Sequence, residues 1–164
     1  IGIAGAAITI TEERAKKVGF TQPYYDSGLS ILVRKADKDT YKTDKDLKNK
    51  IICGQLGTSG AAYARTIEGT TVKTFNTMNE TYMELRNKGC EAVIGDRPTI
   101  AYFMTSNARN KKLFTLQDTI LNVEQFGFIV AKDNKKLLER LDKAFEEAKK
   151  DGSYKALLVK WFGQ

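Results

Sequence analysis

Arg14 is the residue whose position most strongly indicates a ligand. It lies in "ITITEERAKKVGF", where Thr11 is expected to cap a helix and Glu12 and Glu13 occupy its first turn. Acids are stabilised at a helix N-terminus, whereas a cation there loses electrostatic energy unless an anion approaches it. The arginine therefore either forms a salt bridge with one of these acids or a remote one, or binds the anionic group of a ligand.

Two further features lie where open parallel sheets bind ligands, beyond the carboxyl ends of the strands. The turn "QLGTSG", from Gln55 to Gly60, follows a predicted strand and leads into a helix. Its small residues can cradle an anion with backbone amides, although a tight turn with an N-cap would have the same pattern. Asp96 ends the predicted strand "AVIGD" and is either a helix cap or a carboxylate that binds a cation.

Together these groups suit a ligand that carries both charges. A carboxylate would bind Arg14 and the turn at Ser59, an ammonium would bind Asp96, and Thr9 lies just before the arginine. Each charge-assisted hydrogen bond contributes about 1.5–3 kcal/mol, and micromolar affinity needs about 8 kcal/mol. A few such bonds would therefore hold a zwitterion at micromolar affinity.

Composition excludes several other classes of function. The 164 residues carry a net charge of +7, but basic and acidic residues are interleaved, which is typical of a solvated surface and not of a nucleic-acid site. The chain has no His, so His-based catalysis and His metal sites are excluded, and neither a metal nor a cofactor is expected. Cys53 and Cys90 lie in or beside apolar strands. Buried free thiols are the favoured interpretation, and a disulfide is the alternative in an oxidising compartment.

The pattern of apolar residues predicts a mixed α/β protein. The pattern of residues 50–107 predicts a strand followed by a helix three times in succession, which favours a parallel sheet with right-handed crossovers. Strands at 27–35 and 123–132 flank this block and would connect two lobes. The predicted division assigns residues 1–30 and 126–164 to a discontinuous lobe 1 and residues 31–125 to lobe 2.

Several stretches resemble one protein family, and the similarity runs along the whole chain in order and spacing. They are "AITITEERAKKVGFTQPYYDSG", "GQLGTSG", "EAVIGDRPTIAYF", "EQFGFIVAK" and "GSYKALLVKWFG". They resemble the extracellular solute-binding proteins of polar amino-acid ABC transporters, family 3, which have the type II periplasmic-binding-protein fold. The resemblance implies two α/β lobes, with lobe 2 an open, mostly parallel sheet that has helices on both faces.

The same resemblance implies a function. Members bind a free L-amino acid in an interlobe cleft and deliver it to the membrane permease of an ABC importer, without catalysis. They work in the periplasm or attached by a lipid to the outer face of the cell membrane, after removal of a signal peptide. The alternatives on this fold are the ligand-binding sensor domain of a receptor and a small-acid dehydratase, which would use Asp96. A polar or charged amino acid is expected, but the sequence does not specify which one.

The resemblance also assigns roles to individual residues. Thr9 and Arg14 would hold the α-carboxylate from lobe 1, and the backbone amide of Ser59 would hold it from lobe 2. Asp96 would bind the α-ammonium, together with the hydroxyl of Thr9. The carbonyl of Ala7, a residue that replaces the family's usual glycine, would also bind the α-ammonium. Gln55 would contact the ligand side chain, and Thr58 lines the same turn.

Two expectations concern residues outside this set. Arg97, next to Asp96, faces either the pocket or the solvent, and the solvent is the favoured interpretation. Family members carry further residues before the segment that matches Ile1, so the chain is expected to be an N-terminally truncated fragment with an incomplete lobe 1. A complementing chain or a swapped dimer would then replace the missing part, and the fragment alone would be impaired in binding.

Overall fold

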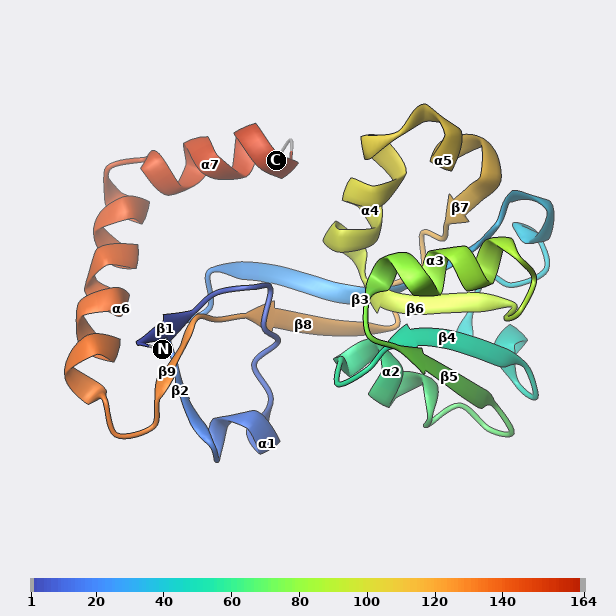
Figure 1. Ribbon diagram of the computed structural model, residues 1–164. Coiled ribbons are helices and arrows are strands. Elements are labelled where there is room, and N and C mark those ends of the chain that lie inside the picture. Colours follow the sequence, from blue (N-terminus) through green and yellow to red (C-terminus); the bar gives the residue numbers. More distant parts are fainter. Residues whose placement is uncertain (1, 163–164) are drawn as a thin grey trace. The chain divides into compact units, whose positions relative to one another are not determined.

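The computed structural model describes residues 2–162, and in it the chain forms two compact units (Figure 1). Unit 1 consists of residues 1–26 and 124–164, and unit 2 consists of residues 27–123. The ends of the predicted lobe 1, Ile1 and 163–164, lie outside the described residues.

Two paired strands carry the chain from one unit to the other. Strand β3 (Tyr25–Arg34) contains the first boundary, and strand β8 (Asn122–Phe126) contains the second. The two strands pair with each other. The chain therefore enters and leaves unit 2 along neighbouring strands.

Unit 2 contains a mixed sheet with the strand order β5-β4-β6-β3-β7, and β8 also pairs with β3. The strands that follow one another in the strand–helix repeats pair in parallel, β4 with both β5 and β6. Strand β3 is antiparallel to β6 and β7. The bounds of these strands are β4 Ile51–Gln55, β5 Thr71–Phe75, β6 Ala92–Asp96 and β7 Phe114–Leu116.

The helices of unit 2 begin where side chains satisfy the first amides. Thr77 and Glu80 form a capping box at the start of α3, with the spacing of three residues that is typical of this motif. Asn107 caps α5, a helix that the sequence did not reveal, by accepting a hydrogen bond of 2.9 Å from the Arg109 amide. The helices are α2 Ser59–Ala64, α3 Met78–Arg86, α4 Arg97–Ser106 and α5 Ala108–Leu113, and two 3-10 helices are η1 Lys35–Asp37 and η2 Asp44–Leu47.

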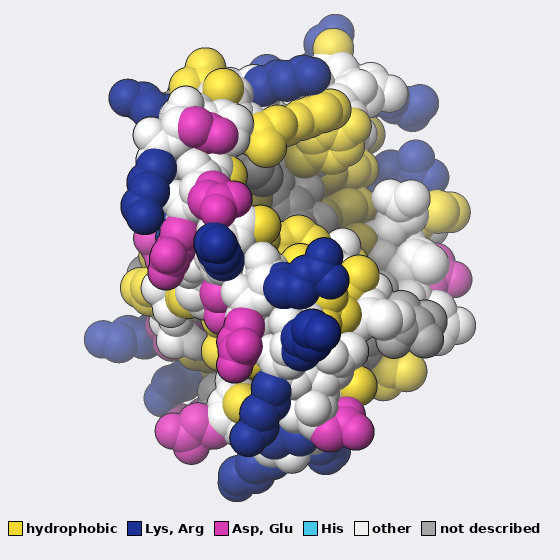
Figure 2. All heavy atoms as spheres, turned by 90° about the vertical axis from the view of Figure 1, so that its left-hand side faces the viewer, with side chains coloured by type: hydrophobic (Ala, Val, Ile, Leu, Met, Phe, Trp, Pro, Cys, Tyr) yellow, Lys and Arg dark blue, Asp and Glu magenta, His cyan; other side chains and the backbone are white. Residues whose placement is uncertain are grey.

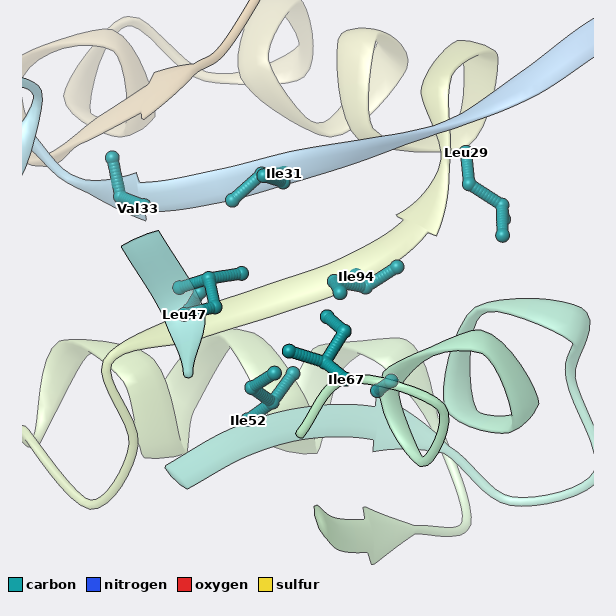
Figure 3. Close-up of a cluster of buried hydrophobic side chains, with 9 residues drawn as sticks. Leu29, Ile31, Val33, Leu47, Ile52, Ile67 and Ile94 are labelled. Carbon is teal, nitrogen blue, oxygen red and sulfur yellow. The ribbon is translucent and has the colours of Figure 1, made fainter. Parts of the chain in front are cut away.

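Alternating side chains of the sheet build one core on each of its faces. On β3, Leu29, Ile31 and Val33 join the cluster that also contains Ala64 and Ile67, which belong to α2 and the turn after it (Figure 3). The intervening Leu32 joins a second cluster with Tyr82 and Leu85 of α3 and Ile100 of α4. This period of two places helices on both faces of the sheet, as predicted.

A disulfide joins Cys53 of β4 to Cys90, two residues before β6. Both residues are fully buried in the second cluster. The favoured interpretation of these cysteines as free thiols was therefore wrong. It failed because sequence spacing does not show which residues of neighbouring strands lie side by side.

Unit 1 contains a small antiparallel sheet with the strand order β1-β9-β2. The predicted strand 123–132 is split, because its first part pairs with β3 and its second part, β9, pairs with β1 and β2. Between the two parts, the amide of Phe128 donates to the hydroxyl of Thr21 at 3.0 Å. The strands are β1 Ile3–Ala4, β2 Val18–Phe20 and β9 Ile129–Ala131.

The C-terminal helices of unit 1 are α6 (Lys135–Lys150) and α7 (Ser153–Phe162), separated by Gly152 with φ +82°. The apolar side chains of α6 are at most half-buried, as at Leu138 and Phe145. Basic and acidic side chains mix over the face shown in Figure 2, as the interleaved sequence predicts. No helix among the described residues has the length and apolar character needed to cross a bilayer.

Candidate functional site

In unit 1 the structure brings Arg14 and Thr9 into direct contact. Thr11 caps α1 (Glu12–Ala15) as predicted, since its hydroxyl accepts a hydrogen bond of 3.2 Å from the amide of Arg14. The guanidinium turns back along the chain, and its Nη1 donates to the carbonyl oxygen of Thr9 at 2.9 Å. Glu13, one of the acids proposed as a partner for this arginine, has its carboxylate 3.9 Å from the ammonium of Lys17. The arginine is half-buried and held in a defined direction.

Ala7 lies two residues before Thr9 and has an unusual backbone conformation. Its φ is 51°, in the left-handed region that favours glycine. This conformation lies between β1, which comprises only Ile3–Ala4, and the bridge that Thr9 forms with Phe126. The glycine expected at this position would adopt the same conformation without strain.

In unit 2 the turn after β4 has the hydrogen bonds that an N-terminal cap requires. The hydroxyl of Thr58 accepts from the amide of Ala61 at 3.2 Å and donates to the carbonyl of Gln55 at 2.8 Å. Ser59 is the first residue of α2. The side-chain amide of Gln55 donates to the carbonyl of Asn76 at 3.0 Å, which ties the ends of β4 and β5 together.

Gly60 brings this turn against the end of β6. A Cβ atom at this residue would lie 2.5 Å from the carbonyl oxygen of Ile94, so only glycine permits the approach. Ile94 lies two residues before Asp96, the last residue of β6. The structure therefore gathers Thr58, Ser59 and Asp96 at one edge of the sheet, as the parallel order predicts.

Asp96 does not act as a helix cap. It occupies the N-cap position of α4, but its side chain makes no capping hydrogen bond. Its negative charge acts on Tyr82 of α3: burial raises the pKa of this phenol, and Asp96 raises it further. The interpretation of Asp96 as a simple cap is therefore not supported, and its carboxylate remains the acidic group at this edge of the sheet.

Arg97 was favoured to face the solvent, but its side chain is only 35% exposed and one end of the guanidinium binds within unit 2. Its Nη1 donates to the carbonyl of Gln117 at 2.7 Å and to the hydroxyl of Ser30 at 3.2 Å. The guanidinium thus joins the start of α4 to strand β3 and to the segment that follows β7. Because these partners are distant in sequence, local patterns could not reveal them.

One family model matches the chain over residues 1–164, that of the bacterial extracellular solute-binding proteins, family 3. The chain belongs to this family. Among residues 2–162 of this solute-binding protein, no group of three or more His, Cys, Asp or Glu side chains could hold a metal ion.

Similar proteins have names that refer to amino-acid binding. The "ABC transporter arginine-binding protein 1" of Escherichia coli K12 is 33% identical to this solute-binding protein over 97% of the chain. The "L-cystine-binding protein TcyJ" of the same strain is 34% identical over 95%. The chain spans 65% and 58% of the length of these two relatives. An ancestral arginine-binding protein solved with arginine superimposes with a TM-score of 0.91 at 34% identity, covering 99% of this chain and 72% of that one.

Sequence reasoning missed one polar residue of unit 1, Glu124 in strand β8. Its side chain is buried, with 6% of the residue exposed, and accepts a hydrogen bond from the hydroxyl of Thr9. A signal was available, because Glu124 and Phe126 are two residues apart in a strand and so share a face. An acid on the face of a buried aromatic residue needs a polar partner.

Proposed function

We propose that this solute-binding protein binds a free L-amino acid and delivers it to an ABC importer. Membership of the family over residues 1–164 is the observation that carries this proposal. The names of the relatives, which refer to arginine and cystine, favour an amino acid with a polar or charged side chain. The family's description as extracellular and the buried disulfide both support a site of action outside the cytoplasm, in the periplasm or at the outer face of the membrane.

In this proposal the two units contribute opposite charges to one ligand. Arg14 of unit 1 binds the α-carboxylate together with the backbone amide of Ser59, and Asp96 of unit 2 binds the α-ammonium. Gln55 and Thr58 lie in the same turn as Ser59. The carbonyl of Ala7 accepts a hydrogen bond from the α-ammonium. Because Asp96 neutralises the ammonium, it is not available as the acid that a dehydratase would need, and we propose a binding role without catalysis.

A thermal-shift screen with the twenty amino acids and L-cystine tests the function, because a ligand that binds the native state raises the melting temperature. Calorimetry with the best ligand then tests the site. We expect Arg14→Gln and Asp96→Asn each to weaken binding by about 2–3 kcal/mol, since each leaves one charge of the ligand without its partner.

Two exposed residues supply matched controls, Arg109→Gln and Asp133→Asn. These variants make the same charge changes elsewhere and should bind like the wild type. If the site variants also bind like the wild type, the assignment of Arg14 and Asp96 is wrong. If no amino acid shifts the melting temperature of the wild type, the proposed function itself fails.

A further inference from the structure

Glu124 and Thr9 form a buried hydrogen-bonded pair inside unit 1. The hydroxyl Oγ1 of Thr9 donates to the carboxylate Oε2 of Glu124 at 2.9 Å. Only 4% of Thr9 and 6% of Glu124 is exposed. Burying a carboxylate costs free energy unless it accepts hydrogen bonds, and the hydroxyl of Thr9 supplies one of the donors that Glu124 needs.

Backbone pairing sets this geometry. Thr9 forms an antiparallel bridge with Phe126. The amide of Ile10 donates to the carbonyl of Gln125 at 2.8 Å, and the amide of Gly127 donates to that of Ile8 at 3.0 Å. Residues two apart in a strand share a face, so Glu124 is the diagonal neighbour of Thr9 on the side of Phe126. The hydroxyl is therefore held by the fold and not by a flexible loop.

The direction of this hydrogen bond limits what the hydroxyl can offer to a ligand. A threonine hydroxyl has one hydrogen and two lone pairs, and a carboxylate only accepts. With its hydrogen on Glu124, the oxygen of Thr9 can accept a hydrogen bond but cannot donate one. It suits an ammonium group and not a carboxylate.

Arg14 offers hydrogen-bond donors, in contrast to the acceptor on Thr9. Its Nη1 donates to the carbonyl of Thr9 at 2.9 Å, and the guanidinium has further N–H groups in the same plane. A carboxylate would therefore find its donors on Arg14, whereas an ammonium would find an acceptor on Thr9. The resemblance assigned Thr9 to both charged groups of the ligand, and the hydrogen bond to Glu124 restricts its hydroxyl to the role of acceptor.

We infer that Glu124 is a positioning residue that fixes the hydroxyl of Thr9 as an acceptor for the α-ammonium of the ligand. This inference rests on the proposed function. It adds a specificity role for a buried acid of unit 1 that acts through Thr9 and selects amino acids over carboxylic acids that lack the amino group.

The test compares two probes that differ by one group. The first is the compound among the twenty amino acids and L-cystine that binds the wild type most tightly, and the second is the same compound without its α-amino group. The ratio of their dissociation constants, measured by calorimetry or by competition, is the selectivity for the ammonium. We expect Glu124→Gln to lower this ratio about tenfold, mainly by weakening the binding of the amino acid. The amide of glutamine can donate to the oxygen of Thr9, which releases the hydroxyl hydrogen of Thr9 from its present partner.

Control variants separate this role from a general effect on folding. Glu91 is a half-buried acid of unit 2 that accepts a hydrogen bond from the amide of Ile51 at 2.8 Å, so Glu91→Gln should leave the ratio unchanged. Thr9→Val should lower the ratio as Glu124→Gln does, and Thr9→Ser should preserve it. If Glu124→Gln does not fold, the variant with Thr9→Val and Glu124→Leu removes both polar partners together, which is tolerated better than removing one.

Each outcome decides a different question. If Glu124→Gln weakens both probes equally, or neither, Glu124 has only a structural role and the inference is wrong while the proposed function stands. If the double variant has a lower ratio than Thr9→Val alone, Glu124 acts on the ligand directly, which also contradicts the inference. If the wild type binds none of the twenty amino acids or L-cystine, the proposed function fails and this inference fails with it.

Discussion

Tyr82 shows how one buried residue can be satisfied in packing and unsatisfied in hydrogen bonding. Its ring stacks on Phe103 with 3.9 Å between the centroids, and only 4% of the residue is exposed. Among the described residues, its hydroxyl is one of the buried side-chain groups without a hydrogen-bond partner. Burying a hydroxyl in this way costs about 1–3 kcal/mol.

We therefore expect Tyr82→Phe to leave the free energy of unfolding unchanged or to raise it at pH 7, as measured by urea denaturation. Burial, and then the charge of Asp96, raises the pKa of Tyr82 above its ordinary value of 10.0. Above pH 10 the unfolded chain releases this proton while the folded protein keeps it, so wild-type stability falls as pH rises. The variant should lose less stability over this range.

Tyr63 provides the matched control, because its hydroxyl donates to the carboxylate of Asp44 at 2.9 Å. Tyr63→Phe should lower the free energy of unfolding by about 1 kcal/mol at pH 7. Equal losses in the two phenylalanine variants would show that the Tyr82 hydroxyl has a stabilising partner after all.

The sequence revealed charged residues that lie at the starts of helices and the ends of strands. Arg14 follows two acids in a first helical turn, and Asp96 ends a buried strand, so the order of residue types was enough to select both. Glu124 could not be selected in this way, because its partner Thr9 lies 115 residues away. The shared face with Phe126 indicates that Glu124 is buried, but the identity of its partner depends on which strands pair.

At the scale of elements, the sequence predicts best those features in which neighbours in sequence are also neighbours in space. The capping box of Thr77 and Glu80 and the strand–helix repeats are of this kind. The break of the predicted strand 123–132 is not, because it reflects a change of partner strands between β8 and β9. The Cys53–Cys90 pair likewise depends on the approach of β4 to the start of β6.

This disulfide should contribute measurably to the stability of unit 2. It closes a loop with a sequence separation of 37 residues, and loops of this size are stabilised by about 2–4 kcal/mol. We expect reduction with a phosphine to lower the melting temperature of the wild type, and a thiol assay to show that native protein reacts only slowly because both sulfur atoms are buried.

The control is the double variant Cys53→Ala and Cys90→Ala, which should have the same lowered melting temperature with or without reductant. A wild type that melts at the same temperature in both conditions would show that the bridge does not form in solution.

At the scale of the whole molecule, the hydrophobic core is distributed unevenly. Both clusters of buried side chains belong to unit 2, where β3, β4 and β6 have most of their side chains buried. In unit 1, helix α6 has no buried residue, and Leu157, Val159 and Trp161 of α7 are more than half exposed. The two units should therefore differ in local stability although one chain forms both.

Native-state hydrogen exchange on the whole chain tests this difference, because amides that exchange only by large-scale opening report the most stable region. We expect the slowest amides in β3, β4 and β6, and amides of α6 at least tenfold faster, since their helical hydrogen bonds are covered by few buried side chains. Addition of an amino acid that binds should slow exchange near Thr9 and Arg14 more than in β4, because the amides of unit 1 exchange through smaller openings that a bound ligand opposes. If the amides of α6 exchange as slowly as those of β4 without ligand, the chain opens as one cooperative body. The uneven distribution of the buried core would then not determine local stability.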